Sequence, residues 1–155
     1  MKKLFALLLA ITMMATLSVT AFAADYDTAG DKGMTVTYSV APAYTVTIPT
    51  DVTIDGNSTT ISAEDVVVEK GQYVSVTLAA DNNFTVTSGE SATLTYTVTK
   101  GGQPVAAGGE ILAVDPTDGK TGTATITFDI DETAIQYAGT YTGSATFTIA
   151  VKPVS

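Results

Sequence analysis

The sequence predicts an all-β fold, and three observations support this prediction. Threonines occupy alternate positions in several segments, with Val, Leu, Ile, Tyr or Phe between them. Because successive strand side chains point to opposite faces of a sheet, this alternation gives each strand one solvent face and one core face. Turn-forming residues interrupt the pattern roughly every 8–12 residues, and no long segment after the N-terminus has a helical apolar period. We therefore expect a β-sandwich of about eight to ten strands with Greek-key connections.

The N-terminus, residues 1–23, has the layout of a secretory signal peptide. Two lysines precede the apolar run Leu4–Val19, and Ala21-Phe22-Ala23 forms a small-x-small cleavage site. Cleavage after Ala23 leaves 155 − 23 = 132 residues, which is enough for one domain with a core. The sequence thus predicts a secreted protein, located outside the cell or on its surface, with no membrane attachment after cleavage.

Two segments are predicted after the cleavage site. Residues 24–33 are rich in Asp and Gly and are expected to form a flexible leader, whereas residues 34–155 form a single sandwich domain. Within that domain, Met34–Val40 and Tyr44–Ile48 alternate on either side of Pro42. Since proline cannot donate to a strand ladder, this arrangement predicts an edge strand that switches between sheets.

The remaining strands are predicted wherever apolar alternation returns between turn residues. Lys100–Gln103 separates two of them and has the glycines of a tight hairpin. Asp131 is expected to cap a single helical turn that reaches Tyr137. These strands are Val52–Ile54, Val66–Val68, Gln72–Ala79, Phe84–Thr87, Ala92–Thr99, Glu110–Val114, Gly122–Ile130 and Thr140–Val151.

Tyr141 is interpreted as a tyrosine corner, with Gly139 giving the chain room to turn before the last strand. In immunoglobulin-like sandwiches, the hydroxyl of such a tyrosine reaches the backbone a few residues upstream. Three other tyrosines, Tyr38, Tyr44 and Tyr96, share the apolar phase of their strands and are predicted to lie in the core.

Two segments resemble small secreted surface proteins of Gram-positive bacteria. Residues 44–54, YTVTIPTDVTI, are similar to the early strands of such proteins, and residues 138–149, AGTYTGSATFTI, are similar to the last strand of pilin-like and WxL-type domains. The resemblance implies an immunoglobulin-like or pilin-like sandwich with a surface, fibre or adhesion role. WxL domains carry tryptophan motifs, and this chain has no Trp, so their peptidoglycan binding does not carry over.

Composition excludes several functions. The net charge is −9, and removing Lys2 and Lys3 makes it −9 − 2 = −11, which disfavours nucleic acid and anionic membranes as partners. The chain has no His and no Cys, so the usual nucleophile–base pairs cannot form, and we do not expect an enzyme.

Two kinds of ligand site remain open from the sequence. Asp129, Asp131 and Glu132 cluster at a strand end and are weak calcium candidates, although solvated turn acids explain them better. Tyr73 has the opposite phase to Val74 and Val76, and Tyr137 lies in a loop, so both are expected to face solvent and are candidate contacts for a ligand such as a glycan. No cofactor is expected beyond this possible calcium.

The sequence therefore predicts a non-catalytic secreted surface or matrix protein that acts in assembly or adhesion. The alternative is a carbohydrate-binding or accessory module of the cell envelope. The expected partners are other copies of the chain, other surface proteins, or glycans. Strand edges of high β-propensity can pair with a neighbour's strand, which gives self-association a physical basis.

Overall fold

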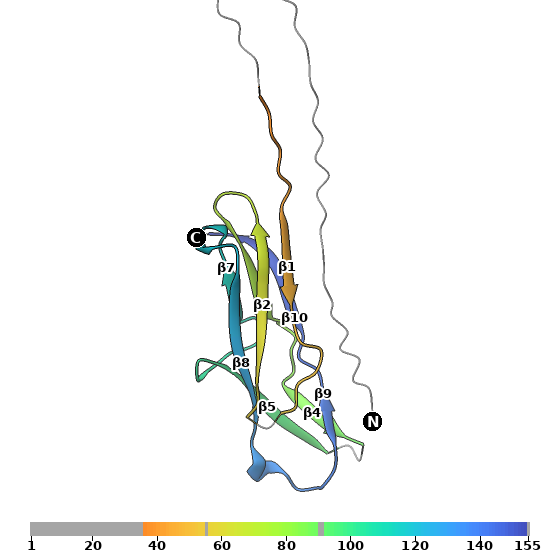
Figure 1. The fold of residues 1–155 in the computed structure, drawn as a ribbon. Coiled ribbons are helices and arrows are strands. Elements are labelled where there is room, and N and C mark those ends of the chain that lie inside the picture. Colours follow the sequence, from red (N-terminus) through yellow and green to blue (C-terminus); the bar gives the residue numbers. More distant parts are fainter. Residues whose placement is uncertain (1–35, 55, 90–91, 155) are drawn as a thin grey trace, which may run out of the picture.

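The computed structural model describes residues 36–54, 56–89 and 92–154. These residues form two antiparallel sheets packed as a β-sandwich, with almost no helix (Figure 1), which confirms the predicted fold class. The predicted signal peptide and leader lie outside the described residues. No helix in the described part of the chain is long and apolar enough to cross a membrane.

The strands are short, and two single 3-10 turns lie between them. The turns are η1 (Pro116–Asp118) and η2 (Glu132–Ala134). The strands are β1 (Ala43–Thr47), β2 (Ser58–Val67), β3 (Gln72–Leu78), β4 (Thr85–Ser88), β5 (Thr93–Lys100), β6 (Gln103–Pro104), β7 (Glu110–Val114), β8 (Gly122–Ile130), β9 (Tyr141–Gly143) and β10 (Phe147–Pro153).

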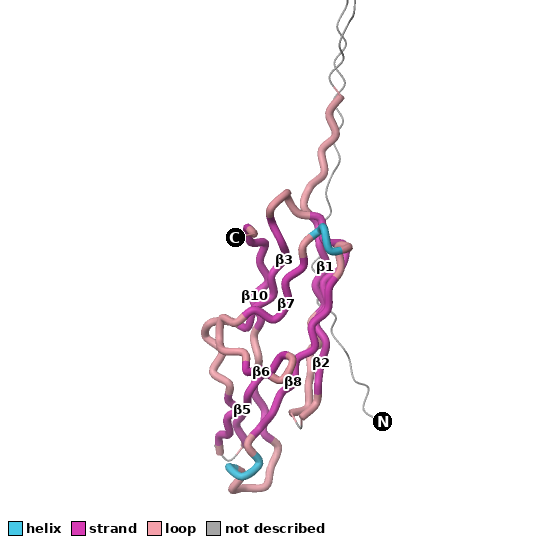
Figure 2. Tube along the Cα trace, turned by 90° about the vertical axis from the view of Figure 1, so that its left-hand side faces the viewer, coloured by secondary structure: helices cyan, strands magenta, loops and turns pink. Residues whose placement is uncertain are grey.

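The large sheet has the order β1-β2-β8-β5-β4-β9, with β6 also paired to β5, and the small sheet has the order β10-β3-β7. Strand β8 lies between β2 and β5, and the connections β2–β3, β3–β4, β6–β7 and β7–β8 each cross from one sheet to the other. The small sheet covers the upper part of the large one, while β4, β5 and β9 extend below it (Figures 1 and 2).

The predicted two-sided alternation is present in the central strands. In β5, Leu94, Tyr96 and Val98 are buried, whereas the threonines between them face outward. On the outer face, hydroxyls of paired strands meet, as between Ser58 and Thr127 at 2.9 Å. The inward set forms one continuous hydrophobic core between the sheets.

The N-terminal strand prediction is confirmed for Tyr44–Ile48, which corresponds to β1, and is wrong for the described part of Met34–Val40. Residues 36–42, which we call the arm, belong to neither sheet and run straight away from the sandwich (Figure 1). The neighbour of β1 is β2, whose last residue, Val67, is paired with Ala43. Because no strand of the described residues lies beyond that point, the arm has no partner among them, and Tyr38 is 76 % exposed rather than in the core. Tyr44 is half-buried against the core, and Tyr96 is buried as predicted.

The predicted last strand, Thr140–Val151, is in fact two strands in different sheets. Strand β9 pairs with β4 in the large sheet, and β10 pairs with β3 in the small one. Residues 144–146 make the switch, fixed by bonds from the Tyr96 hydroxyl to the Ser144 carbonyl (3.0 Å) and from the Ala79 N–H to the Thr146 carbonyl (2.9 Å). The sheet switch therefore occurs here and not at Pro42.

The other element predictions have mixed outcomes. Gly122–Ile130 is confirmed as β8, and Asp131 caps η2 as expected. The Lys100–Gln103 hairpin is present, with Gly101 and Gly102 at φ values of 57° and 78° that suit a type I′ turn. Residues 52–54 were predicted as a strand but are not one. The predicted strand Val66–Val68 overlaps only the last residues of β2, which begins at Ser58.

Candidate functional site

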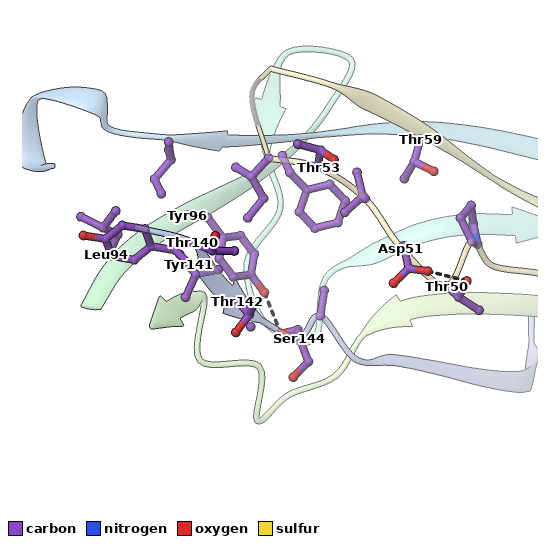
Figure 3. Close-up of a pocket in the computed structure, with 18 of the residues that line it drawn as sticks. Thr50, Asp51, Thr53, Thr59, Leu94, Tyr96, Thr140, Tyr141, Thr142 and Ser144 are labelled. Carbon is purple, nitrogen blue, oxygen red and sulfur yellow. Dashed lines mark hydrogen bonds between the residues drawn. The ribbon is translucent and has the colours of Figure 1, made fainter. Parts of the chain in front are cut away.

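A groove of about 610 Å³ is lined by residues of the large sheet, by the segment after β1 and by the residues around β9 (Figure 3). We call it the edge groove, because its two walls belong to the two ends of the large sheet, where β1 and β9 are the terminal strands. One wall is the segment 48–54, which follows β1, and the other comprises β9 and its flanking residues, 140–145. Its floor is apolar and consists of Ile61, Val86, Leu94, Tyr96, Phe128 and Ile130.

The floor is held by aromatic packing across the central strands. The rings of Tyr96 and Phe128 lie 5.9 Å apart and that of Phe84 lies 5.7 Å from Tyr96, both pairs being tilted. Tilted rings at this separation attract each other beyond their burial of apolar area. The floor is therefore the tightly packed edge of the hydrophobic core and is itself almost fully buried, while Ile135, 46 % exposed, lines the groove at its solvent edge.

The groove is nearly free of charge. Among the described residues that line it, Asp51 is the one that carries a charge, and it accepts a 3.2 Å hydrogen bond from the Thr50 hydroxyl (Figure 3). Hydroxyls of Thr and Ser supply the other polar groups of the walls. Such a surface suits an uncharged apolar ligand with a few polar groups.

One wall of the groove offers an open strand edge. Strand β9 pairs with β4 on one side and is the last strand in the order of the large sheet. Among the described residues, no strand pairs with its second edge, and segment 48–54 opposite it is not a strand. An unpaired edge is a template for adding another strand.

Tyr141 lies at the start of β9, in the wall of the groove. Its hydroxyl donates a 2.9 Å hydrogen bond to the backbone carbonyl of Tyr137, four residues upstream, which is the contact expected of a tyrosine corner. This bond closes the turn between η2 and β9 and thereby positions the groove wall.

Replacing Tyr141 with phenylalanine is expected to lower the free energy of unfolding by about 1 kcal/mol, because the Tyr137 carbonyl loses its donor. Urea unfolding followed by circular dichroism measures the change. Tyr137→Phe is the matched control, since the backbone carbonyl of residue 137 and not its hydroxyl makes this bond. Equal losses in both variants contradict the corner.

Glycine suits the predicted position, because Gly139 has a φ of 158°, which residues with a side chain rarely adopt, and it is also needed at a second position. A Cβ on Gly139 would lie 3.8 Å from the Cβ of Ser88, an ordinary contact. A Cβ on Gly143 would overlap the backbone carbonyl of Thr85 and lie 3.2 Å from the Cα of Val86. Gly143 therefore allows β9 to approach β4 closely, a role that a glycine inside a strand pattern often signals.

The three calcium candidates do not form a ligand cluster. Asp129 is exposed and lies opposite Thr97 on the outer face of the large sheet. Asp131 caps η2 and accepts from both the hydroxyl (2.6 Å) and the N–H (2.9 Å) of Thr133, which lowers the pKa of its carboxyl group. Glu132 begins η2. In the described ranges, no three acidic side chains lie close enough to hold a metal ion.

Tyr73 and Tyr137, the two candidate ligand contacts, lie far apart. Tyr137 is 58 % exposed in the loop between β8 and β9, at the lower end of the sandwich (Figure 1). Tyr73 is paired with Lys152 near the C-terminus, at the upper end. The two side chains therefore do not form one binding platform.

The outer face of the small sheet carries a polar cluster around Glu110. One carboxylate oxygen accepts from the hydroxyls of Ser75 (2.6 Å) and Tyr73 (3.2 Å), and the Lys152 ammonium lies 3.8 Å from it. Desolvation and then the Glu110 charge raise the pKa of the Tyr73 hydroxyl. A hollow of about 230 Å³ lies beside this cluster and is also lined by Asp115 and Asp118.

Sequence reasoning missed the edge groove. The sequence feature that could have indicated the groove is the apolar character of residues 52–54, which form part of its wall and not a strand. No protein-family model matches the sequence, and no curated protein is significantly similar to it.

Proposed function

We propose that this protein is a secreted, non-catalytic component of the cell surface or extracellular matrix that acts by assembly or adhesion. The observation that carries the proposal is the arm. Val36, Tyr38 and Val40 are 81 %, 76 % and 57 % exposed, at alternate positions of an uncharged segment. An exposed row of large apolar side chains on extended backbone favours binding by strand addition.

Charge and composition also favour regulated association. The predicted net charge of −11 after signal cleavage makes copies repel one another at low ionic strength. Salt shortens the range of this repulsion, from about 30 Å at 0.01 M to about 8 Å at 0.15 M. The hydroxyl-rich outer faces of the sheets are well solvated, so association is directed to the apolar surfaces.

The predicted mature chain, residues 24–155, tests the proposal. We expect its sedimentation coefficient to rise with protein concentration, more steeply in 0.15 M than in 0.01 M salt, and we expect assemblies in negative-stain electron microscopy. Binding of the monomer to cells or matrix tests the adhesive form. A chain that stays monomeric in all these conditions and binds neither cells nor matrix contradicts the proposal.

The second candidate function is a carbohydrate-binding or accessory module, and the hollow beside Tyr73 and Glu110 favours it. Carboxylates and a tyrosine around a shallow depression can bind sugar hydroxyls. A glycan array decides the matter: binding that Tyr73→Ala abolishes supports this function, and Tyr137→Ala tests the second tyrosine separately. An array without hits contradicts it.

A further inference from the structure

We propose that the arm of one copy inserts into the edge groove of a second copy and adds a strand to the free edge of its β9. The inference rests on the proposed function, which it deepens by naming both surfaces of the contact. Val36, Tyr38 and Val40 would enter the groove, while Thr37 and Ser39 would face outward.

The two surfaces match in chemistry. The arm, residues 36–42, has no charged residue, and Asp51 is the one charged residue among the described residues that line the groove. Although the chain has a net charge of −9, the arm and the edge groove can therefore meet with almost no electrostatic repulsion. The apolar side chains of the arm are exposed, and the floor of the groove is the apolar edge of the hydrophobic core.

The two surfaces also match in backbone geometry. The arm is extended and belongs to neither sheet, so its N–H and C=O groups are available for a ladder. Strand β9 has a free edge in the wall of the groove. Adding the arm there pairs backbone groups on both partners, as strand addition requires.

A copy cannot fill its own groove with its own arm. The arm joins the start of β1, whereas the groove begins at Ile48, directly after the last residue of β1. The five residues of β1 separate the two by about 17 Å. Because the arm runs directly into β1, no loop is present to reverse its direction.

The contact is therefore head-to-tail. Each copy presents its arm before the start of β1 and its groove from Ile48 onward, after the end of β1, so two different surfaces meet at every junction. Interfaces of this kind repeat and produce rings or open filaments rather than closed dimers.

The first test is a pair of charge substitutions in the arm of the predicted mature chain. Tyr38→Asp is expected to raise the concentration needed for assembly by more than about tenfold. Thr37→Asp adds the same charge at the neighbouring, outward-facing position and is expected to assemble nearly as the wild type does. Since both residues lie outside the sandwich, both variants should keep the wild-type circular dichroism spectrum and melting temperature.

The second test locates the junction by disulfide formation. The chain has no cysteine, so any disulfide joins introduced residues. A Tyr38→Cys copy mixed with an Ile135→Cys copy is expected to form a cross-linked heterodimer under mild oxidation. In the control, a Thr97→Cys copy, changed on the outer face of β5, replaces the Ile135→Cys copy. This control should give little cross-linked heterodimer.

The outcomes separate this inference from the proposed function. If the wild type assembles but Tyr38→Asp assembles equally well, or the Tyr38–Ile135 cross-link does not exceed its control, the arm-in-groove contact is wrong and assembly by another surface stands. If the wild type remains monomeric at every concentration and salt tested, the inference and the assembly function both fail.

Discussion

Replacing Phe128 with alanine is expected to lower the free energy of unfolding by about 3–5 kcal/mol. Phe128 is 3 % exposed on β8, the strand between β2 and β5, and its ring packs on that of Tyr96. Truncation removes the ring and leaves a cavity between central strands that cannot easily close. Domains of this size have a total stability of about 5–15 kcal/mol, so the loss is a large part of it.

Urea denaturation followed by far-ultraviolet circular dichroism measures this effect, because the chain has no tryptophan to report by fluorescence. Thr125→Ala, on the outer face of the same strand, is the control and should change the stability by no more than about 0.5 kcal/mol. A Phe128→Ala cost below about 1.5 kcal/mol contradicts the core position described for this ring.

Replacing Gly143 with alanine is expected to separate β9 from β4. The new Cβ would overlap the Thr85 carbonyl and lie 3.0 Å from a methyl group of Val86, and a paired strand cannot move away without losing its ladder. Overpacking of this kind costs about 1–3 kcal/mol. Because β9 is a wall of the edge groove, we also expect weaker assembly of the folded variant.

Gly89→Ala is the matched control for this substitution. A Cβ on Gly89 meets nothing within 4 Å, and its φ angle is not in the left-handed region. Its stability should equal that of the wild type or exceed it by up to about 1 kcal/mol. If both alanine variants unfold at the same urea concentration, the close approach of β9 to β4 does not matter for stability.

The fold class was predictable because alternation is a local property. Thr93–Lys100 contains its whole pattern, so the sequence shows which residues of β5 face inward. The pairing partner of a strand, in contrast, depends on residues that are far away in the sequence. Residues 36–40 have the same alternation as β5, but they lie beyond the end of β2, and in the part of the chain that the structure describes no strand faces them. The last strand illustrates the same limit, because its pattern continues through the switch at residues 144–146.

The candidate site was less predictable than the fold. The Tyr141 contact with Tyr137 follows from a short sequence motif, and so does the capping of η2 by Asp131. The edge groove combines residues of the large sheet, the segment after β1 and the residues around β9, a combination that no segment specifies alone. In this capping role, the carboxylate of Asp131, one of the three calcium candidates, accepts two hydrogen bonds from Thr133.

The position of the arm and the groove at opposite ends of β1 has a mechanical consequence. In the proposed filament, a pulling force enters each copy through its arm and leaves through its β9, so the force runs along the strands. Ladder hydrogen bonds in antiparallel sheets lie perpendicular to the strands. All bonds of a ladder are then loaded together in shear, and the junction resists tension better than one that is peeled open bond by bond.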